Sequence, residues 1–441
     1  MPIFEPAHLT RLLGSIEAGH LVLLCGAGLS IPSPSNLMSA VRVARTCYDK
    51  WSPIEVLPDA LRDDIDGLAG HFYTRGTFKN VFISTLVPWD DLVGEPNDGH
   101  AAVADFLICG AARAALSANF DGLIEQWSHR RKVSMRGALS ATEAEHFTRT
   151  KPLLKFHGCF LRNPDETLWT QGQLGEPLIQ GRVQSCSAWM NTNLPGRDLL
   201  IVGFWTDWGY LNDVLTNAIA VQSFNSVTVV DPATSAELQR KSPALWTKLS
   251  DGTVSFALIQ ASGAEALAEL RTEFSKVWAR KFFQLGAPFV AAAGGTYDPA
   301  TVRPDNWTCD ELYNLRRDAE GLPYDRAAER KAPAAEAANA AYAHILLNEV
   351  GATRSGSFYE HLGRCIRIVH GGGQTLEAVR ERYNEPPSVA SADIIVCAGA
   401  DVMGTPATVI SVGRGASIVR PARGGGSRWL TLPEARTELG I

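Results

Sequence analysis

The sequence contains no long hydrophobic run, and no stretch approaches the roughly 18 consecutive apolar residues that suggest a membrane span. Its first residues lack a basic segment leading into an apolar one, so we expect no secretory signal. These absences predict a cytoplasmic protein that does not interact with membranes.

Closely spaced cysteine pairs are also missing. The eight cysteines are scattered, and no two of them form a C-x-x-C pair. Zinc ribbons need such pairs, and small disulfide-stapled domains need a denser cysteine framework. The sequence therefore predicts neither kind of domain, and we expect no bound metal.

The chain has no excess of positive charge. Its 41 lysines and arginines are outnumbered by 47 aspartates and glutamates, which gives a formal net charge of −6. Surfaces that bind nucleic acids are usually basic, so direct nucleic-acid binding is not expected. The one basic cluster, residues 129–132, is interpreted as a solvated loop after a helix.

Short apolar runs alternate with helical stretches over the first two-thirds of the chain. This alternation is typical of an α/β protein, and we expect a Rossmann-like parallel sheet with helices on both faces. The expected strands are Leu21–Cys25, Ala115–Ala118, Leu153–Phe156, Leu199–Val202, Val227–Val230 and Val254–Leu258. Such sheets bind ligands along the carboxyl ends of their strands.

Two domains are expected, because a single core rarely organises 441 residues. We place the first at residues 1–284, with a largely helical insertion at 31–110 and a closing helix at Ala264–Phe283. Residues 285–441 are predicted to form a smaller α/β domain for oligomerisation or regulation. Its expected elements are Pro333–Asn348 as a helix and Cys365–Val369, Ile394–Ala398, Val409–Val412 and Ser417–Val419 as strands.

The first expected strand runs directly into the sequence Gly-Ala-Gly-Leu-Ser. The missing side chains of such a turn let backbone amides approach a pyrophosphate. Ile31 stands where a G-x-G-x-x-G motif has its third glycine, so a plain strand-to-helix turn remains an alternative. The candidate phosphate-binding residues are Gly26, Ala27, Gly28 and Ser30.

An asparagine and an aspartate follow the second expected strand. At the mouth of a parallel sheet, the amide of Asn119 can orient a hydroxyl group or a water molecule. The carboxylate of Asp121 can accept a hydrogen bond from a sugar hydroxyl. The alternative is that the two residues cap the amphipathic helix that comes next.

Further polar residues and glycines follow the later strands. His157, after the third strand, can hydrogen-bond a ribose hydroxyl or move a proton near pH 7. Gly203 and Thr206, after the fourth, can contact phosphate or ribose. Asp231, after the fifth, suits the adenosine end of a dinucleotide. Each of these residues by itself is also explained by ordinary turn chemistry.

The order of these strand-end groups resembles the sirtuin superfamily over roughly residues 10–283. The groups are Gly-Ala-Gly-x-Ser, Ser-x-Asn-x-Asp, His-Gly, Gly-x-x-Thr and Val-Val-Asp-Pro. Within that superfamily the chain is most similar to the sirtuin-like NADases of bacterial anti-phage defence. Residues 119–125, 156–159 and 203–207 carry that similarity.

The resemblance implies NAD+ as the substrate and makes Asn119 and His157 the residues essential for its cleavage. It implies that the glycine turn holds the diphosphate, Asp121 the nicotinamide-side ribose region and Asp231 the adenosine side. Two features depart from the sirtuin deacylases. The zinc module with its two C-x-x-C pairs is absent, and residues 31–36 replace the Pro-Asp-Phe-Arg loop.

These features favour an NAD+ hydrolase that releases nicotinamide and ADP-ribose and depletes NAD+ during defence. Two alternatives stay open: an NAD+-dependent protein deacylase, and a nucleotide-sensing scaffold subunit without catalysis. The resemblance also implies a homo-oligomer, with a HerA-type ATPase or an Argonaute-like protein as a partner.

Overall fold

The computed structural model describes residues 2–131, 133–147, 150–205, 208–209, 212–213, 224–300, 302, 304–320, 337–356, 358–371, 375–383, 392–400, 411–413, 416–418 and 427–441. The described chain divides into two compact units after Arg271, inside the long helix α11 (Gly263–Ala292). The boundary expected from the sequence lies further along the same helix.

A sheet of six strands forms the centre of the first unit, in the order β3-β2-β1-β4-β5-β6. Every neighbouring pair of strands is parallel. The strands are β1 (Leu21–Cys25), β2 (Ala114–Ser117), β3 (Leu153–Lys155), β4 (Arg197–Val202), β5 (Phe224–Val230) and β6 (Ser255–Ile259). All six expected strands are present, so the Rossmann-like parallel sheet predicted from the sequence is confirmed.

The direction in which the chain crosses this sheet reverses between β1 and β4. From β1 the chain passes through β2 to β3 at one edge, and from β4 it passes through β5 to β6 at the other. In open parallel sheets, the carboxyl ends of the strands on either side of such a reversal form a crevice for ligands. The fold therefore places a ligand site after β1 and β4.

Helices cover both faces of the sheet. Apolar side chains of α7, α9 and α10 share one core with alternate residues of the strands, and α1 and α4 pack against β1 and β2. The bounds are α1 (Pro6–Ala18), α4 (Asp98–Cys109), α5 (Leu123–Arg130), α6 (Ala141–Glu145), α7 (Pro177–Asn193), α9 (Ser235–Lys241) and α10 (Pro243–Ser250). All five residues of β1 are buried, as in a central parallel strand.

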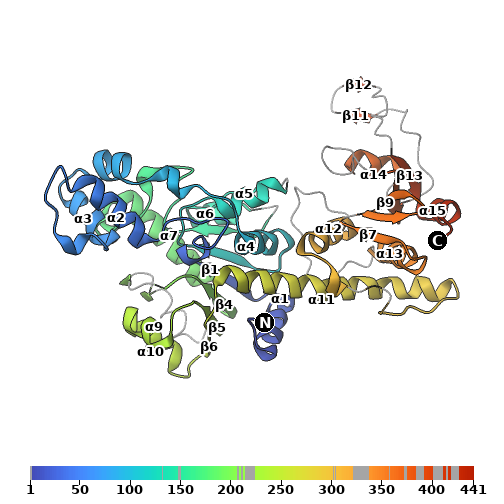
Figure 1. The fold of residues 1–441 in the computed structure, drawn as a ribbon, viewed down its shortest axis with the longest axis horizontal. Helices are drawn as coiled ribbons and strands as arrows, with labels where there is room; N and C mark the ends of the chain where they lie inside the picture. The colour runs from blue at the N-terminus through green and yellow to red at the C-terminus, as the bar shows by residue number, and fades with distance from the viewer. Residues whose placement is uncertain are drawn as a thin grey trace. The chain divides into compact units, whose positions relative to one another are not determined.

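The segment expected as a helical insertion, residues 31–110, contains α2 (Ala40–Trp51), α3 (Ile65–Thr74) and the π-helix η3 (Phe78–Leu86). Figure 1 shows α2 and α3 next to each other, and with η3 they enclose an aromatic core of their own. Helix α4 ends this segment but packs on the sheet, and all of its residues after Asp98 are buried.

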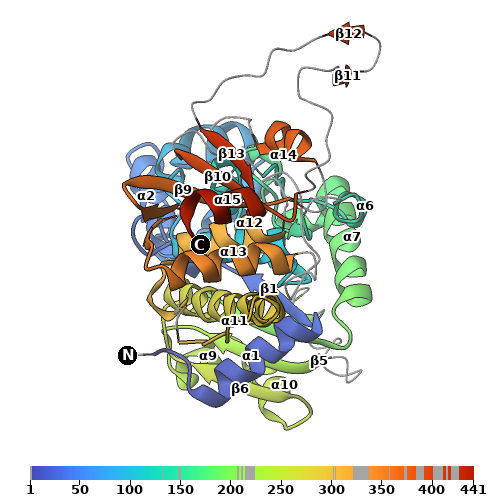
Figure 2. The same ribbon diagram turned by 90° about the vertical axis from the view of Figure 1, so that its right-hand side faces the viewer.

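The second unit contains a mixed sheet of five strands in the order β13-β10-β9-β8-β7. Its strands are β7 (Thr353–Ser355), β8 (Phe358–His361), β9 (Arg364–His370), β10 (Ile394–Ala398) and β13 (Arg428–Thr431). Strands β9, β10 and β13 are parallel and lie side by side in Figure 2, whereas β8 is antiparallel to both of its neighbours. The sequence predicted β9 and β10 but missed the other three strands.

Helices flank this second sheet as well. α12, α13 and α15 contribute to the core on one face, and α14 contributes to the core on the other. Their bounds are α12 (Cys309–Glu320), α13 (Ala338–Glu349), α14 (Leu376–Tyr383) and α15 (Leu432–Leu439). Two short strands, β11 (Ser411–Gly413) and β12 (Ala416–Ile418), form a separate antiparallel pair. Residues 333–336, 409–410 and 419, parts of three expected elements, lie outside the described residues.

The expected end of the closing helix at Phe283 is wrong, because α11 continues to Ala292 through Gly286 and Pro288. A Cβ atom at Gly286 would lie 2.8 Å from the amide nitrogen of Tyr342 in α13. The glycine therefore allows two helices to pack closely and does not end one of them. Among the described residues, no helix is long and apolar enough to cross a membrane.

Candidate active site

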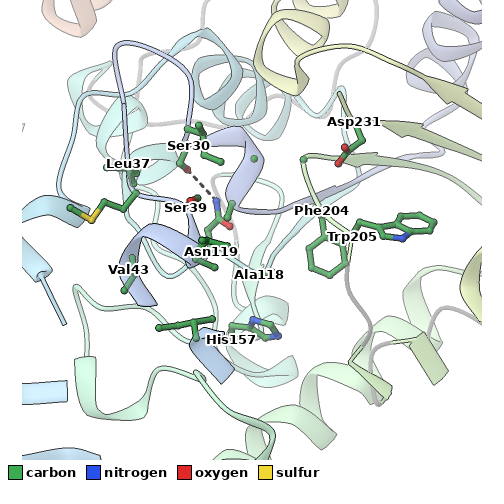
Figure 3. A pocket seen from close by; sticks show the side chains of 18 of the residues that line it. Ser30, Leu37, Ser39, Val43, Ala118, Asn119, His157, Phe204, Trp205 and Asp231 are labelled. Carbon is green, nitrogen blue, oxygen red and sulfur yellow. Dashed lines mark hydrogen bonds between the residues drawn. The ribbon is translucent and has the colours of Figure 1, made fainter. Parts of the chain in front are cut away.

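A cavity of about 790 Å³ lies at the carboxyl edge of the first sheet (Figure 3). This volume is within the range of roughly 300–1,000 Å³ that is typical of small-molecule sites. The predicted site residues that line it are Ala27, Gly28, Ser30, Asn119, Asp121, His157, Gly203 and Asp231. Gly26 lies directly before these lining residues, and Thr206 falls outside the described residues.

The glycine turn after β1 is in backbone contact with the turn after β4. The amide of Gly26 donates to the carbonyl of Val202 at 3.1 Å, and the amide of Gly28 donates to the carbonyl of Gly203 at 3.0 Å. A Cβ atom on Gly26 would lie 2.6 Å from both the Gly203 carbonyl oxygen and the Phe204 Cβ atom. Gly26 is therefore required for the two turns to meet.

This use of the turn leaves few of its amides for a phosphate. The amides of Leu29 and Ser30 donate to the carbonyls of Gly26 and Ala27 and close a short helical turn. Only the Ala27 amide makes no hydrogen bond within the described part of the chain. A diphosphate at this turn would therefore meet one free donor and a backbone surface without side chains.

Ser30 is the centre of a buried hydrogen-bond network at the cavity wall. Its Oγ donates to Asp121 Oδ2 at 2.9 Å, lies 3.0 Å from His100 Nε2 and accepts from Asn119 Nδ2 at 3.2 Å. The hydroxyl thus uses its single proton and both lone pairs within the protein. We conclude that Ser30 fixes its neighbours and has no hydrogen-bonding capacity left for a phosphate.

His100 was missed by the sequence analysis. Its Nδ1 accepts from the Asn97 amide at 3.2 Å, so the proton of the neutral ring is on Nε2, which donates to Ser30. This tautomer cannot accept the Ser30 proton, so the pair is not an activated nucleophile. Asn97 caps α4 and forms a capping box with His100. The only sequence signal was an asparagine in front of a strongly apolar helix.

Asn119 presents one end of its amide to the protein and the other to the cavity. Its Nδ2 donates to the carbonyl of Gly26 at 3.1 Å and to Ser30 Oγ. Two acceptors facing one end of the amide assign nitrogen to that end. Among the described residues Oδ1 accepts no hydrogen bond, and Asn119 lines the cavity, so this oxygen is available as an acceptor for a ligand while the Nδ2 bonds hold the amide in place.

Asp121 lines the cavity, although its carboxylate already has two protein partners. Oδ2 accepts from Ser30, and Oδ1 accepts from the Leu123 amide at the start of α5, at 3.1 Å. Asp121 thus bonds the first amide of α5, but the N-cap residue of this helix is Gly122, so neither Asn119 nor Asp121 is the N-cap considered from the sequence. Asn119 instead bonds across to the glycine turn.

His157 follows β3 and lines the same cavity (Figure 3). Its ring centroid lies 4.8 Å from that of Phe156 and 5.2 Å from that of Trp208. Burial among these groups lowers the pKa of His157 to about 3, and the charge of Arg182 acts in the same direction. The imidazole is therefore neutral at physiological pH, a state that suits a hydrogen-bond partner of a ligand better than an acid.

The cavity has one apolar wall and one polar end. Apolar side chains from the segment after the glycine turn line the wall, which is closed by Trp169 against Phe120 at 4.7 Å between ring centroids. Asp231 stands at the polar end, where its Oδ1 accepts from the Ala233 amide at 2.9 Å. Three lining residues of that end were not predicted: Glu237, Arg240 and Lys241.

Within the residues that the structure describes, no group of three or more His, Cys, Asp or Glu side chains could hold a metal ion. All eight cysteines are free thiols.

Comparison with known proteins finds a family match for the segment that carries Asn119, His157 and Asp231. Residues 113–250 match the family of SIR2-like domains, a segment that contains β2, β3, β4 and β5. This segment, less than half of the chain, is similar to SIR2-like domains, and the match agrees with the resemblance to sirtuins drawn from the strand-end residues. No protein with a curated description matches the chain.

Solved Sir2 structures are similar to the chain at low identity. One, described as the structural basis for the mechanism and regulation of Sir2 enzymes, is 14% identical with a TM-score of 0.34 over 59% of this chain and 95% of that chain. A Sir2 homolog–NAD complex is 16% identical with a TM-score of 0.34, and the match covers 59% of this chain and 91% of that chain. A Sir2 bound to an acetylated peptide is 16% identical with a TM-score of 0.35, and the match covers 60% of this chain and 98% of that chain.

His100 gives the protein a specific acid sensitivity. Burial lowers the pKa of His100 to about 4, against about 6.5 in an unfolded chain. Between these values the unfolded state binds the proton and the folded state does not, so stability falls as the pH drops below about 6.5. Between pH 6.5 and 5 the expected loss from this one group is about 2 kcal/mol.

The variant His100→Gln should therefore show a shallower fall in unfolding free energy over this pH window, even though it is less stable at pH 7. Urea titrations at pH 5, 6 and 7 measure how the unfolding free energy of the wild type and of the variant changes with pH. Parallel pH profiles for the variant and the wild type would contradict a buried, neutral His100.

Proposed function

We propose that the chain hydrolyses NAD+ at the bond between nicotinamide and ribose. The observation that supports this most is the pair of side chains after the adjacent strands β2 and β3. Asn119 and His157 line one cavity of suitable size and supply a fixed acceptor oxygen and a neutral imidazole. The SIR2-like domain adds the expectation that the ligand is NAD+.

The chemistry of the leaving group fits a site without an acid. When the C1′–N bond breaks, nicotinamide takes the bonding electron pair and its ring nitrogen loses its positive charge. No proton has to be delivered to it. The ribose becomes oxocarbenium-like, water adds to C1′, and one proton is released. A His157 with a pKa of about 3 is thus compatible with the reaction.

Each residue has a distinct part in this proposal. The Oδ1 of Asn119 orients the attacking water or a ribose hydroxyl and stabilises developing positive charge. His157 accepts a hydrogen bond from a ribose hydroxyl and so holds the sugar. Asp121 holds Ser30 and α5 in place beside the nicotinamide-side ribose.

The rest of the dinucleotide follows the edge of the sheet. The Ala27 amide meets the diphosphate, while Gly28 and Gly203 allow it close to the backbone. Asp231 keeps one carboxylate oxygen for an adenosine ribose hydroxyl, because the Ala233 amide bonds the other. Arg240 and Lys241 lie at this end and add positive charge near the phosphates.

We further propose that the enzyme is an effector of bacterial anti-phage defence that acts as a homo-oligomer. A HerA-type ATPase or an Argonaute-like protein would be its partner, and the second unit would serve assembly. Segment 31–110 provides a means of control, because residues 37–41 and Val43 of this segment line the cavity. A shift of this segment would change access to Asn119 and thereby keep the hydrolase silent until assembly.

Protein deacylation is the second candidate, since the apolar wall could also accept an acyl chain. The two functions differ in the acceptor of the ADP-ribosyl group. We predict that purified protein, assayed at several concentrations, releases nicotinamide and ADP-ribose from NAD+ with no peptide present, as resolved by chromatography. Adding an acetylated peptide should leave the rate unchanged. Release that requires the peptide would overturn hydrolysis in favour of deacylation.

A further inference from the structure

Lys155 is a fully buried lysine that the proposed chemistry does not use. It ends β3, two residues before His157, and its exposed fraction is 1%. Its Nζ donates to the carbonyl of Asp121, lies 3.2 Å from Glu125 Oε1 and lies 3.4 Å from Cys159 Sγ. A buried ammonium group is tolerated only where it is paired and hydrogen-bonded, and here it is both.

The bonds of this ammonium connect the two sides of the candidate site. Asp121 belongs to the loop that carries Asn119, Glu125 is in α5 directly after that loop, and Lys155 shares a strand end with His157. The loop makes a backbone bond to the same region, from the amide of Phe160 to the carbonyl of Phe120. Lys155 is the side chain that fixes the loop beneath Asn119 relative to β3.

Neighbouring residues pack closely around Lys155 and Glu125. A Cβ atom at Gly137 would lie 2.8 Å from Lys155 Cγ and 2.9 Å from Glu125 Oε1. Neither Lys155 nor Glu125 lines the cavity, so neither touches a ligand there. Burial opposes the charge of Lys155, but Glu125, Cys159 and Asp121 together raise its pKa above the usual value, so the group stays charged.

We propose that Lys155 is a positioning residue for NAD+ cleavage: by holding the Asp121 carbonyl, it keeps Asn119 at the correct distance from His157. This inference rests on the proposed function. The positioning role of Lys155 differs from that of a purely structural ion pair in one respect. A structural pair is replaceable by apolar side chains that pack equally well, whereas the hydrogen bond to the Asp121 carbonyl is not.

Paired substitutions separate these two roles. Removing one partner of a buried ion pair leaves an uncompensated group, whereas replacing both by apolar residues of similar volume is often neutral. We therefore compare Lys155→Met with the double variant Lys155→Met/Glu125→Leu. The variant Glu125→Gln keeps an acceptor for Lys155 and the bond to Asp121.

The matched control is another buried ion pair among the described residues of this unit. Arg271 Nε bonds Asp105 Oδ2 at 2.7 Å, with side chains exposed by 4% and 0%, and neither residue lines the cavity. The double variant Arg271→Met/Asp105→Leu removes the same kind of interaction away from the site. It should keep the wild-type turnover and NAD+ affinity.

We expect Lys155→Met/Glu125→Leu to melt within a few degrees of the wild type and to bind NAD+ within about threefold by calorimetry. Its kcat for nicotinamide release should fall by about 10²-fold, because small displacements of catalytic groups are that damaging. The single variant Lys155→Met should lose kcat equally and also melt about 10 °C lower. Glu125→Gln should keep kcat within about fivefold.

Two results would overturn the inference while leaving the proposed function intact. One is a stable double variant with wild-type kcat, and the other is an equal loss of kcat in the double variant and in the Arg271/Asp105 control. Wild-type protein that binds NAD+ but releases no nicotinamide, even at concentrations at which it is assembled, would instead remove the proposed function, and the positioning role with it.

Discussion

Asn119→Ala is expected to slow nicotinamide release by about 10²–10³-fold while the dissociation constant of NAD+ changes by less than about fivefold. The variant loses the acceptor oxygen that faces the cavity, whereas the glycine turn and Asp231 still bind the dinucleotide. Single-turnover assays measure the chemical step, and calorimetry measures affinity. A matched control is Asn225→Ala, since Asn225 bonds the carbonyl of Gly196 and lies outside the cavity lining.

His157→Ala is the second half of the same prediction and should lower kcat by a similar factor. Because the pKa of His157 is about 3, no change in rate between pH 6 and 8 should trace to its protonation. Cleavage that persists in both variants would exclude these two residues from catalysis. A rate that falls with an apparent pKa near 6.5 in the wild type, but not in His157→Ala, would contradict a neutral imidazole.

The sheet could be predicted because its strands are simple. Runs such as Leu21–Cys25 are apolar on both faces and short, which is typical of buried parallel strands. Strands β7, β8 and β13 were missed because they are short and partly polar. Thr353–Ser355, for example, has two exposed residues out of three and pairs at the edge of its sheet. Of the three, only β13 pairs with a strand that is distant in the sequence, β10, whereas β7 and β8 pair with strands next to them along the chain.

The residues of the candidate site could be predicted only in part from the sequence. Residues that follow strands were found, because a parallel sheet brings every strand end to one edge. His100 was not, because its role arises from contact with Ser30, 70 residues away in the sequence. Lys155 did carry a signal in the form of a charged residue inside an apolar strand. Such a residue needs a buried partner, but the sequence alone could not identify it as Glu125.

The glycine turn shows how one sequence pattern can have two causes. The sequence interpretation treated Gly26 and Gly28 as an approach for phosphate, which still applies to Gly28 as a lining residue. In the structure, both glycines also meet the turn after β4, with Gly203 in a left-handed conformation at φ +57°. The packing of the two turns therefore requires glycine at position 26 whether or not a ligand binds. This requirement can be tested by measuring the stability of the fold alone.

Gly26→Ala should destabilise the first unit by about 3 kcal/mol or more, because overpacking here cannot be relieved by a flexible side chain. The added Cβ would meet the Gly203 carbonyl and the Phe204 Cα and Cβ atoms, all within 2.7 Å, at the junction of the two central strands. Thermal melting and urea titration measure the loss.

The control for this substitution is Gly181→Ala in the interior of α7, where an added Cβ has no atom within 4 Å. Alanine is the better helix former, so this variant should gain up to about 1 kcal/mol. The two substitutions add the same methyl group and are expected to change stability in opposite directions. Equal melting temperatures for the two variants would mean that the turns after β1 and β4 are not in contact, and the crevice between them would lose its structural basis.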